Sequence, residues 1–336
     1  MGPLTRRWFN TADSRQLIHI ISAGQKGLGV FAKVNIPRGT RIIAEPPLMK
    51  LDQVGNSITI WKAFNKLKPL EKEKYLELHH LECDKEYELM NPALEKNRQK
   101  LRIAKVLAIY RLNKSICHAG TIVVSYLPSR FNHSCLPNTK CAENPNLGDG
   151  VSTIHAVRDI KEGEELTYPY VPDFNRPKDQ RQGTLYWQGG FLCLCEACSD
   201  SDFARSMDHK RQELSRLDQR VSDQEQYPWT KVVDGSSTLK DFQQMEVLQK
   251  DLGLHEALGV TYGRAARYCC SRLQDSQLTL EWASKTLANN RVCLGADHPI
   301  CKDLVEMVSL LESAVRASGP FPSAVAEFYS LPLWDT

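Results

Sequence analysis

The hydrophobic and polar positions change their spacing several times along the chain, and each change predicts a different kind of structure. Over residues 1–60 short apolar groups alternate with polar residues and turns, which is typical of β-strands. Over about 61–118 Lys and Glu become frequent and apolar residues recur at helical spacing, as between Leu94 and Arg111. Strand-like segments and turns return over 119–200. This part of the pattern predicts small sheets interrupted by a helical insert.

The remaining third of the chain favours helices. Residues 201–252 are very polar and predict a solvated helix or a linker. From about 253 apolar positions again recur every three to four residues, which predicts two or three antiparallel helices. The tail over 319–336 is rich in aromatic residues and proline and gives no clear prediction. We therefore expect an α+β fold with a C-terminal helical domain over 253–336.

Length and composition narrow the class of protein. A chain of 336 residues is long enough for two domains, and 42% hydrophobic residues can fill their cores. No apolar run approaches the roughly 20 residues that span a bilayer. The basic pair Arg6 and Arg7 is not followed by the apolar stretch of a secretory signal. We expect no membrane partner and a location in the cytoplasm, the nucleus or both.

Charge and cysteine content exclude two further classes. The chain has 43 basic and 40 acidic residues, so its net charge of +3 lacks the strong basic excess of a nucleic-acid-binding domain. We expect no direct contact with nucleic acid, while a basic protein substrate stays possible. Eleven cysteines are an odd count and too few for a disulfide scaffold. They are better interpreted as reduced thiols, some of which bind metal.

The strongest local signal is a run of three cysteines within six residues, namely Cys193, Cys195 and Cys198. A structural zinc ion takes four thiolate or imidazole ligands in a tetrahedron, so this run is one ligand short. The fourth ligand must come from a distant segment, for which Cys135 is the best candidate and Cys141 the next. The alternative is a group of unrelated free thiols.

Three other segments carry candidate chemistry, although each alone is also typical of an ordinary turn or strand. Residues 26–32 read K-G-L-G-V-F-A, in which the missing Cβ atoms let a ligand approach the backbone. The segment lacks the third glycine of a dinucleotide-binding motif. Asn132 and His133 offer hydrogen-bond donors and acceptors side by side. Tyr168 and Tyr170 are two residues apart and would share one face of a strand.

Together and in this order, four motifs resemble those of the SET-domain family of S-adenosylmethionine-dependent protein lysine methyltransferases. They are K-G-L-G-V-F-A, S-R-F-N-H-S-C-L-P-N, G-E-E-L-T-Y-P-Y and C-L-C-E-A-C. The resemblance covers about residues 15–200 and includes a post-SET cysteine segment at 191–198. The helical insert and the C-terminal helices are similar to the SET-and-MYND branch. Between residues 45 and 115 the only histidines and cysteines are His79, His80 and Cys83. The zinc finger of that branch, which needs many such residues, is therefore missing.

The resemblance implies roles for individual residues. S-adenosylmethionine would lie between the turn and the Asn-His pair, with Phe191 stacking on its adenine. Tyr170 would be the catalytic residue beside the transferring methyl, and Tyr168 would line the same pocket or the lysine channel. The implied cofactor-binding residues are Lys26, Gly27, Leu28, Gly29, Asn113, Asn132, His133, Tyr168 and Phe191. The sequence around Asn113 matches the family poorly.

The resemblance also implies a metal, a substrate and a division into domains. One structural Zn²⁺ would bind Cys135, Cys193, Cys195 and Cys198, and the substrate would be a lysine of a histone or another protein. The SET domain would span 1–200, followed by the polar segment 201–252 and the helical domain 253–336. Two alternatives stay open. One is a SET scaffold that acts on a small molecule or catalyses a reaction other than methylation; the other is a non-catalytic interaction protein, which the presence of Tyr170, Asn132 and His133 disfavours.

Overall fold

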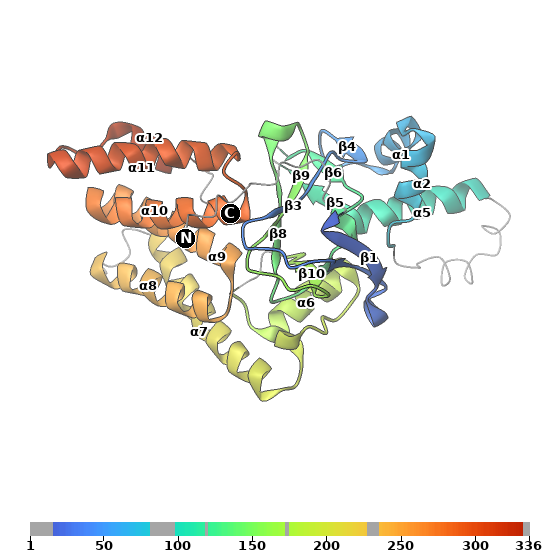
Figure 1. Cartoon of the computed structure of the whole chain (residues 1–336), viewed down its shortest axis with the longest axis horizontal. Coiled ribbons are helices and arrows are strands. Elements are labelled where there is room, and N and C mark those ends of the chain that lie inside the picture. The colour runs from blue at the N-terminus through green and yellow to red at the C-terminus, as the bar shows by residue number, and fades with distance from the viewer. Residues whose placement is uncertain (1–15, 81–97, 118–119, 172–174, 227–234, 332–336) are drawn as a thin grey trace, which may run out of the picture.

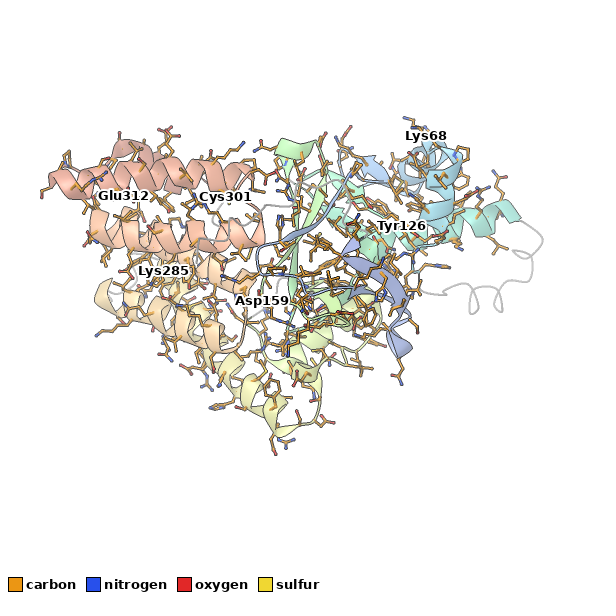
Figure 2. The ribbon with its side chains drawn as sticks, viewed as in Figure 1. Lys68, Tyr126, Asp159, Lys285, Cys301 and Glu312 are labelled. Atoms are coloured by element: carbon orange, nitrogen blue, oxygen red, sulfur yellow. The ribbon has the colours of Figure 1, made fainter. Side chains whose placement is uncertain are left out.

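The computed structural model describes residues 16–80, 98–117, 120–171, 175–226 and 235–331. Three small β-sheets occupy the middle of the molecule, with the helices of the insert on one side and the C-terminal helices on the other (Figure 1). Side chains fill the space between these layers, with Tyr126 near the insert and Lys285 and Cys301 among the C-terminal helices (Figure 2). The expected α+β fold is confirmed.

The first sheet brings together the motifs at both ends of the predicted SET region. Its strand order is β1 (Ile18–Ser22), β2 (Leu28–Ala32), β10 (Glu165–Tyr168) and β7 (Asn132–His133). β10 runs antiparallel to β2 and parallel to β7, with Tyr168 opposite His133. This pairing places the Asn-His pair beside the strand that leads to Tyr170.

The other two sheets complete the strand-rich centre. One has the order β3 (Arg41–Glu45), β9 (Ser152–Ala156), β8 (Thr139–Glu143), and every residue of its central strand β9 is buried. Apolar side chains of the first two sheets share one core, which includes Val30, Ile42, Ile154 and Leu166. The third sheet has the order β4 (Met49–Leu51), β6 (Ile122–Val124), β5 (Lys114–Ile116).

The helical insert packs on the third sheet and has its own core. It consists of α1 (Ser57–Lys66), α2 (Pro69–Leu76) and α5 (Arg98–Asn113), whose apolar faces meet around Phe64 and Tyr75. The insert begins slightly earlier than expected because Asn56 caps α1, accepting hydrogen bonds from two backbone amides of its first turn. It ends earlier because 114–116 form strand β5. Cys83 and the start of the expected helix from Leu94 lie outside the described residues.

Helices form most of the described chain after the second sheet. Their bounds are α6 (Lys178–Gly189), α7 (Asp202–Gln226), α8 (Gly235–Asp251), α9 (His255–Tyr268), α10 (Ser276–Cys293), α11 (Pro299–Ala317) and α12 (Ser323–Ser330). The polar segment forms α7 and α8, and α7 buries Met207, Leu214 and Val221 on one face. Within the described residues no helix has the length and apolar character required to cross a membrane. The domain boundaries stay a prediction.

Charged and polar contacts tie the second sheet to the C-terminal helices. Lys140 on β8 forms an ion pair with Glu256 on α9, and both side chains are largely buried. Arg41 on β3 forms an ion pair with Asp297, just before α11. His298, the N-cap of α11, lies with its Nε2 3.0 Å from the carbonyl oxygen of Glu143. These contacts fix the position of α9 and α11 against the second sheet.

We predict that Glu256→Gln lowers the free energy of unfolding by about 1–3 kcal/mol, because it leaves the Lys140 ammonium partly buried without its counter-charge. Urea unfolding of the purified protein measures this change. Glu306→Gln on the exposed face of α11 is the matched control and should change stability by less than about 0.5 kcal/mol. Equal effects of the two substitutions would contradict the role of this ion pair.

Candidate cofactor site and metal centre

The turn before β2 is held against β7 and β10 by polar side chains. Asn132 Nδ2 donates hydrogen bonds to the carbonyl oxygen of Leu28, at 3.1 Å, and to Oε1 of Glu165, at 2.8 Å. Lys26 forms an ion pair with the same carboxylate. Three of the predicted segments thus meet at Glu165. This residue lies inside the G-E-E-L-T-Y motif, but the sequence alone gave it no role.

Gly27 at the end of this turn and Gly29 on β2 serve different purposes. A Cβ on Gly29 would lie 2.9 Å from both Asn132 Nδ2 and Glu165 Oε1, so only glycine allows that close approach. Gly27 has a φ of +79°, and a Cβ placed there would meet no heavy atom within 4 Å. Open space therefore lies beside the backbone of Gly27, as a ligand contacting the turn requires, whereas the space above Gly29 is filled by protein.

Aromatic rings gather around His133, the second residue of β7. The ring of Tyr170 lies 5.5 Å from those of Tyr168 and His133 and 6.2 Å from that of Phe191. Phe191 also lies 6.2 Å from His133, edge-on. The predicted residues of the middle and post-SET motifs therefore form one cluster, although β10 ends at Tyr168 and Tyr170 lies just beyond the strand rather than on it.

The hydroxyl of Tyr170 has a fixed partner. It donates a hydrogen bond to the carbonyl oxygen of Phe131 at 2.7 Å, while 44% of the residue's surface is exposed. Burial raises the pKa of Tyr170 and of Tyr168, so both hydroxyls are protonated at neutral pH. Tyr170 therefore presents a neutral, oriented oxygen and is not a base.

Both ring nitrogens of His133 are used within the protein. Nδ1 accepts a hydrogen bond from the backbone N–H of Tyr170 at 3.0 Å, and Nε2 lies 3.4 Å from Sγ of Cys135. Because a backbone amide can only donate, we assign the proton of the neutral ring to Nε2, facing the sulfur. The imidazole thus links Tyr170 to the cysteines, and a contact between His133 and a cofactor stays a prediction.

Asn113 forms its hydrogen bonds within the insert, and its contact with a cofactor stays a prediction. At the end of α5 its Nδ2 donates to the carbonyl oxygens of Ile109 and His79, both at 2.8 Å. This amide therefore holds the insert together, and no contact within the described chain joins it to Asn132, Tyr170 or the turn. Leu28 contributes its carbonyl to the site, while its side chain is 51% exposed.

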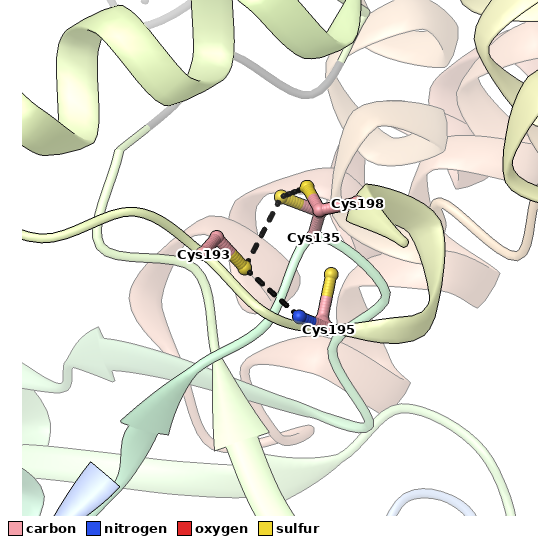
Figure 3. Close-up of side chains that lie close together, drawn as sticks. All are labelled: Cys135, Cys193, Cys195 and Cys198. Carbon is pink, nitrogen blue, oxygen red and sulfur yellow. Dashed lines mark hydrogen bonds between the residues drawn. The ribbon is translucent and has the colours of Figure 1, made fainter. Parts of the chain in front are cut away.

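Four cysteines converge from two distant segments (Figure 3). The sulfur atoms of Cys135, Cys193, Cys195 and Cys198 all lie within 4.8 Å of one another. Sγ of Cys135 is 3.9 Å from that of Cys193 and 3.6 Å from that of Cys198. Zn–S bonds of about 2.3 Å in a tetrahedron separate the sulfurs by about 3.8 Å. The group can hold a metal ion such as zinc, and its donor set fits that ion.

The grouping distinguishes between the candidates for the fourth ligand. Cys135 is in the group, whereas Cys141 lies on β8 outside it. Two arginines that sequence reasoning missed, Arg181 and Arg211, are buried beside these cysteines. Nothing in the local sequence marks them, because their helices approach the centre only in the folded chain.

Comparison with known protein families agrees with this geometry. The family model described as SET domain matches residues 27–171, which contain Gly27, Asn132, His133 and Tyr170. The chain therefore contains a SET domain over this range.

Three curated proteins are similar to parts of this chain. The chain is 31% identical to histone-lysine N-methyltransferase set5 of Schizosaccharomyces pombe over 209 residues, 62% of this chain and 59% of that protein. It is 39% identical to histone-lysine N-methyltransferase ATXR2 of Arabidopsis thaliana over 84 residues, 25% of this chain and 17% of that protein. A SET and MYND domain-containing protein of Dictyostelium discoideum is 34% identical over 90 residues, 26% of this chain and 22% of that protein. The chain thus matches less than two thirds of the length of each of these three.

We predict that Cys195→Ser causes loss of bound zinc on dialysis, a lower Tm and loss of S-adenosylmethionine binding together, because all three depend on a closed cysteine group. Zinc content by mass spectrometry, thermal unfolding and calorimetric titration measure the three effects. Cys117→Ser is the matched control, since Cys117 is a partly buried free thiol outside the group. A Cys195→Ser protein that retains the zinc content of the parent would contradict the ligand assignment.

Proposed function

We propose that this chain transfers a methyl group from S-adenosylmethionine to the side-chain amine of a lysine in a protein substrate. The observation that carries the proposal is the convergence of the open turn at Gly27, the amide of Asn132 and the oriented hydroxyl of Tyr170 around the parallel pair β7 and β10. The match of residues 27–171 to the SET-domain family model supports it.

The residues around the turn suit the amino-acid end of the cofactor. Both N–H bonds of the Asn132 amide are directed at protein acceptors, which leaves Oδ1 to accept from an ammonium group. The backbone near Gly27 is accessible, and Phe191 supplies an aromatic face for a purine. When bound, S-adenosylmethionine would supply a methyl group already activated by its positive sulfur.

Tyr170 orients the reacting groups and has no acid–base role. Its proton is committed to the Phe131 carbonyl, so the lone pairs of its oxygen are available for weak C–H···O contacts with a methyl group. Its raised pKa keeps it neutral across the physiological range. The main contribution of the site is therefore alignment of two reactants and exclusion of water.

The substrate lysine must arrive without its proton. A free lysine has a pKa of about 10.4, so deprotonation at pH 7 costs roughly 4–5 kcal/mol at 1.36 kcal/mol per unit. The rings of Tyr168 and Tyr170, with Phe131 buried behind Tyr168, form an aromatic environment that disfavours the charged amine. A neighbouring cationic sulfur would lower the lysine pKa further, so the proton leaves to solvent before transfer and no dedicated base is required.

The cysteine group would act as a structural zinc centre. Four thiolate ligands leave no open coordination position for a substrate. A metal there would fix the post-SET segment against Cys135 and so hold Phe191 edge-on to His133 and Tyr170. Its contribution to activity would be to close one wall of the pocket.

The names of the relatives make histone lysines the first substrates to test, and they are consistent with a protein of the cytoplasm or nucleus. We would incubate the zinc-loaded protein and radiolabelled S-adenosylmethionine with core histones, a lysine-containing peptide array and a cell extract. Label in a lysine side chain supports the proposal. Binding of the cofactor without label in any protein would favour a small-molecule substrate or another reaction, and absence of cofactor binding would favour an interaction protein.

We predict that Tyr170→Phe lowers kcat at least about tenfold, equivalent to about 1.4 kcal/mol of transition-state stabilisation, because it removes the oxygen beside the methyl. The Kd for S-adenosylmethionine should change less than about threefold, since the turn and Asn132 are untouched. Single-turnover methylation and calorimetry measure the two values. Tyr186→Phe, at a tyrosine that is 63% exposed on α6, is the control. A Tyr170→Phe enzyme with the parent kcat would refute the assigned role.

A further inference from the structure

Two arginines are buried against the cysteine group from two different helices. Arg181 on α6 and Arg211 on α7 are 2% and 1% exposed. Nη2 of Arg181 lies 3.8 Å from Sγ of Cys198 and donates to the carbonyl oxygen of Ala197 at 3.5 Å. Nη2 of Arg211 donates to the carbonyl oxygen of Cys135 at 2.7 Å. Each guanidinium therefore contacts one of the two segments that supply the cysteines.

The charges of these groups are complementary. A zinc ion with four thiolates carries a net charge of −2, which is costly to bury without compensation. Two arginines stay charged at all physiological pH values and together supply +2. Asp208, at 3.8 Å from Arg181 Nη1, also accepts a hydrogen bond from the backbone N–H of Lys178 at 2.5 Å. A zinc–thiolate centre would add a negative charge next to both guanidinium groups.

The cysteine group also belongs to the core of the C-terminal helices. Cys135, Cys193 and Cys198 share one buried apolar cluster with Met207 and Leu214 of α7 and continue into the helices beyond it. The core of the first two sheets is a separate cluster. Arg211 lies between Met207 and Leu214 on the buried side of α7. The charge of the centre therefore bears directly on how α7 packs.

We propose that Arg181 and Arg211 are positioning residues that retain the metal by balancing its thiolate charge, and that they make the packing of α7 depend on metal occupancy. The inference rests on the zinc centre of the proposed function. Loss of zinc would leave two guanidinium groups in an apolar cluster without the charge they balance, so the first half of α7 would loosen. The metal thus locks the C-terminal helices to the post-SET segment as well as closing the pocket.

The first test measures zinc release to a chromogenic chelator from Arg181→Met and Arg211→Met proteins, after zinc content is confirmed by mass spectrometry. Outer-shell partners of metal ligands typically change metal affinity by about 10–100-fold, and we expect release to accelerate by about that factor. Arg211→Lys keeps the charge and should restore much of the retention. Arg264→Met, which removes a largely buried guanidinium paired with Asp218 and Glu225, is the control.

The outcomes separate the inference from the metal centre on which it rests. Release at the parent rate from folded Arg181→Met and Arg211→Met proteins would overturn the inference, as would equal acceleration by Arg264→Met. A parent protein without bound zinc would instead overturn the metal centre, and this inference with it. Acceleration confined to the two arginines near the cysteines is the expected result.

The second test uses the unmodified chain, so it does not depend on a variant folding. Hydrogen exchange is followed before and after zinc is removed by a chelator. We expect amides of α7 between Ala204 and Leu217 to exchange at least tenfold faster without zinc, while amides of β2 and β9 in the other core keep their protection. Unchanged exchange in α7 after zinc removal would overturn the coupling.

Discussion

The approach of Cys135 to the post-SET cysteines is the contact on which the rest of the site depends. It joins segments 58 residues apart in sequence, and no regular sheet pairing within the described chain joins them directly. Because these sulfur atoms lie together, Phe191 contacts the rings of His133 and Tyr170. Cys135, Cys193 and Cys198 lie in the core of the C-terminal helices, and Cys195 packs against this core. One small centre therefore connects the aromatic cluster with the helices behind it.

The imidazole of His133 extends this dependence to Tyr170, the residue proposed to lie beside the transferred methyl group. One ring nitrogen faces the sulfur of Cys135, and the other accepts the backbone N–H of Tyr170. The hydroxyl of Tyr170 is oriented separately by Phe131, on the same short stretch of chain. Catalytic geometry in this account is thus a consequence of strand pairing and of the cysteine group. This agrees with a methyl transfer in which alignment contributes more than acid–base chemistry.

Much of this arrangement could be predicted from sequence, because the decisive signals are local. The spacing of Cys193, Cys195 and Cys198 required a distant fourth ligand, and the structure groups them with Cys135. Contacts between distant segments produce no comparable pattern in the local sequence. The carboxylate of Glu165, the two buried arginines and the commitment of Asn113 to α5 and His79 follow from packing between segments. The polar segment was also hard to interpret, since the buried face of α7 is narrow and includes Arg211.

The most direct test of the central claim is a calorimetric titration with S-adenosylhomocysteine, the demethylated product, of zinc-loaded protein and of the same preparation after zinc removal. The account predicts one bound equivalent for the loaded protein and a loss of affinity of at least tenfold after removal, while the core of the first two sheets stays folded. Equal affinity with and without zinc would show that the pocket forms independently of the cysteine group and would contradict the account.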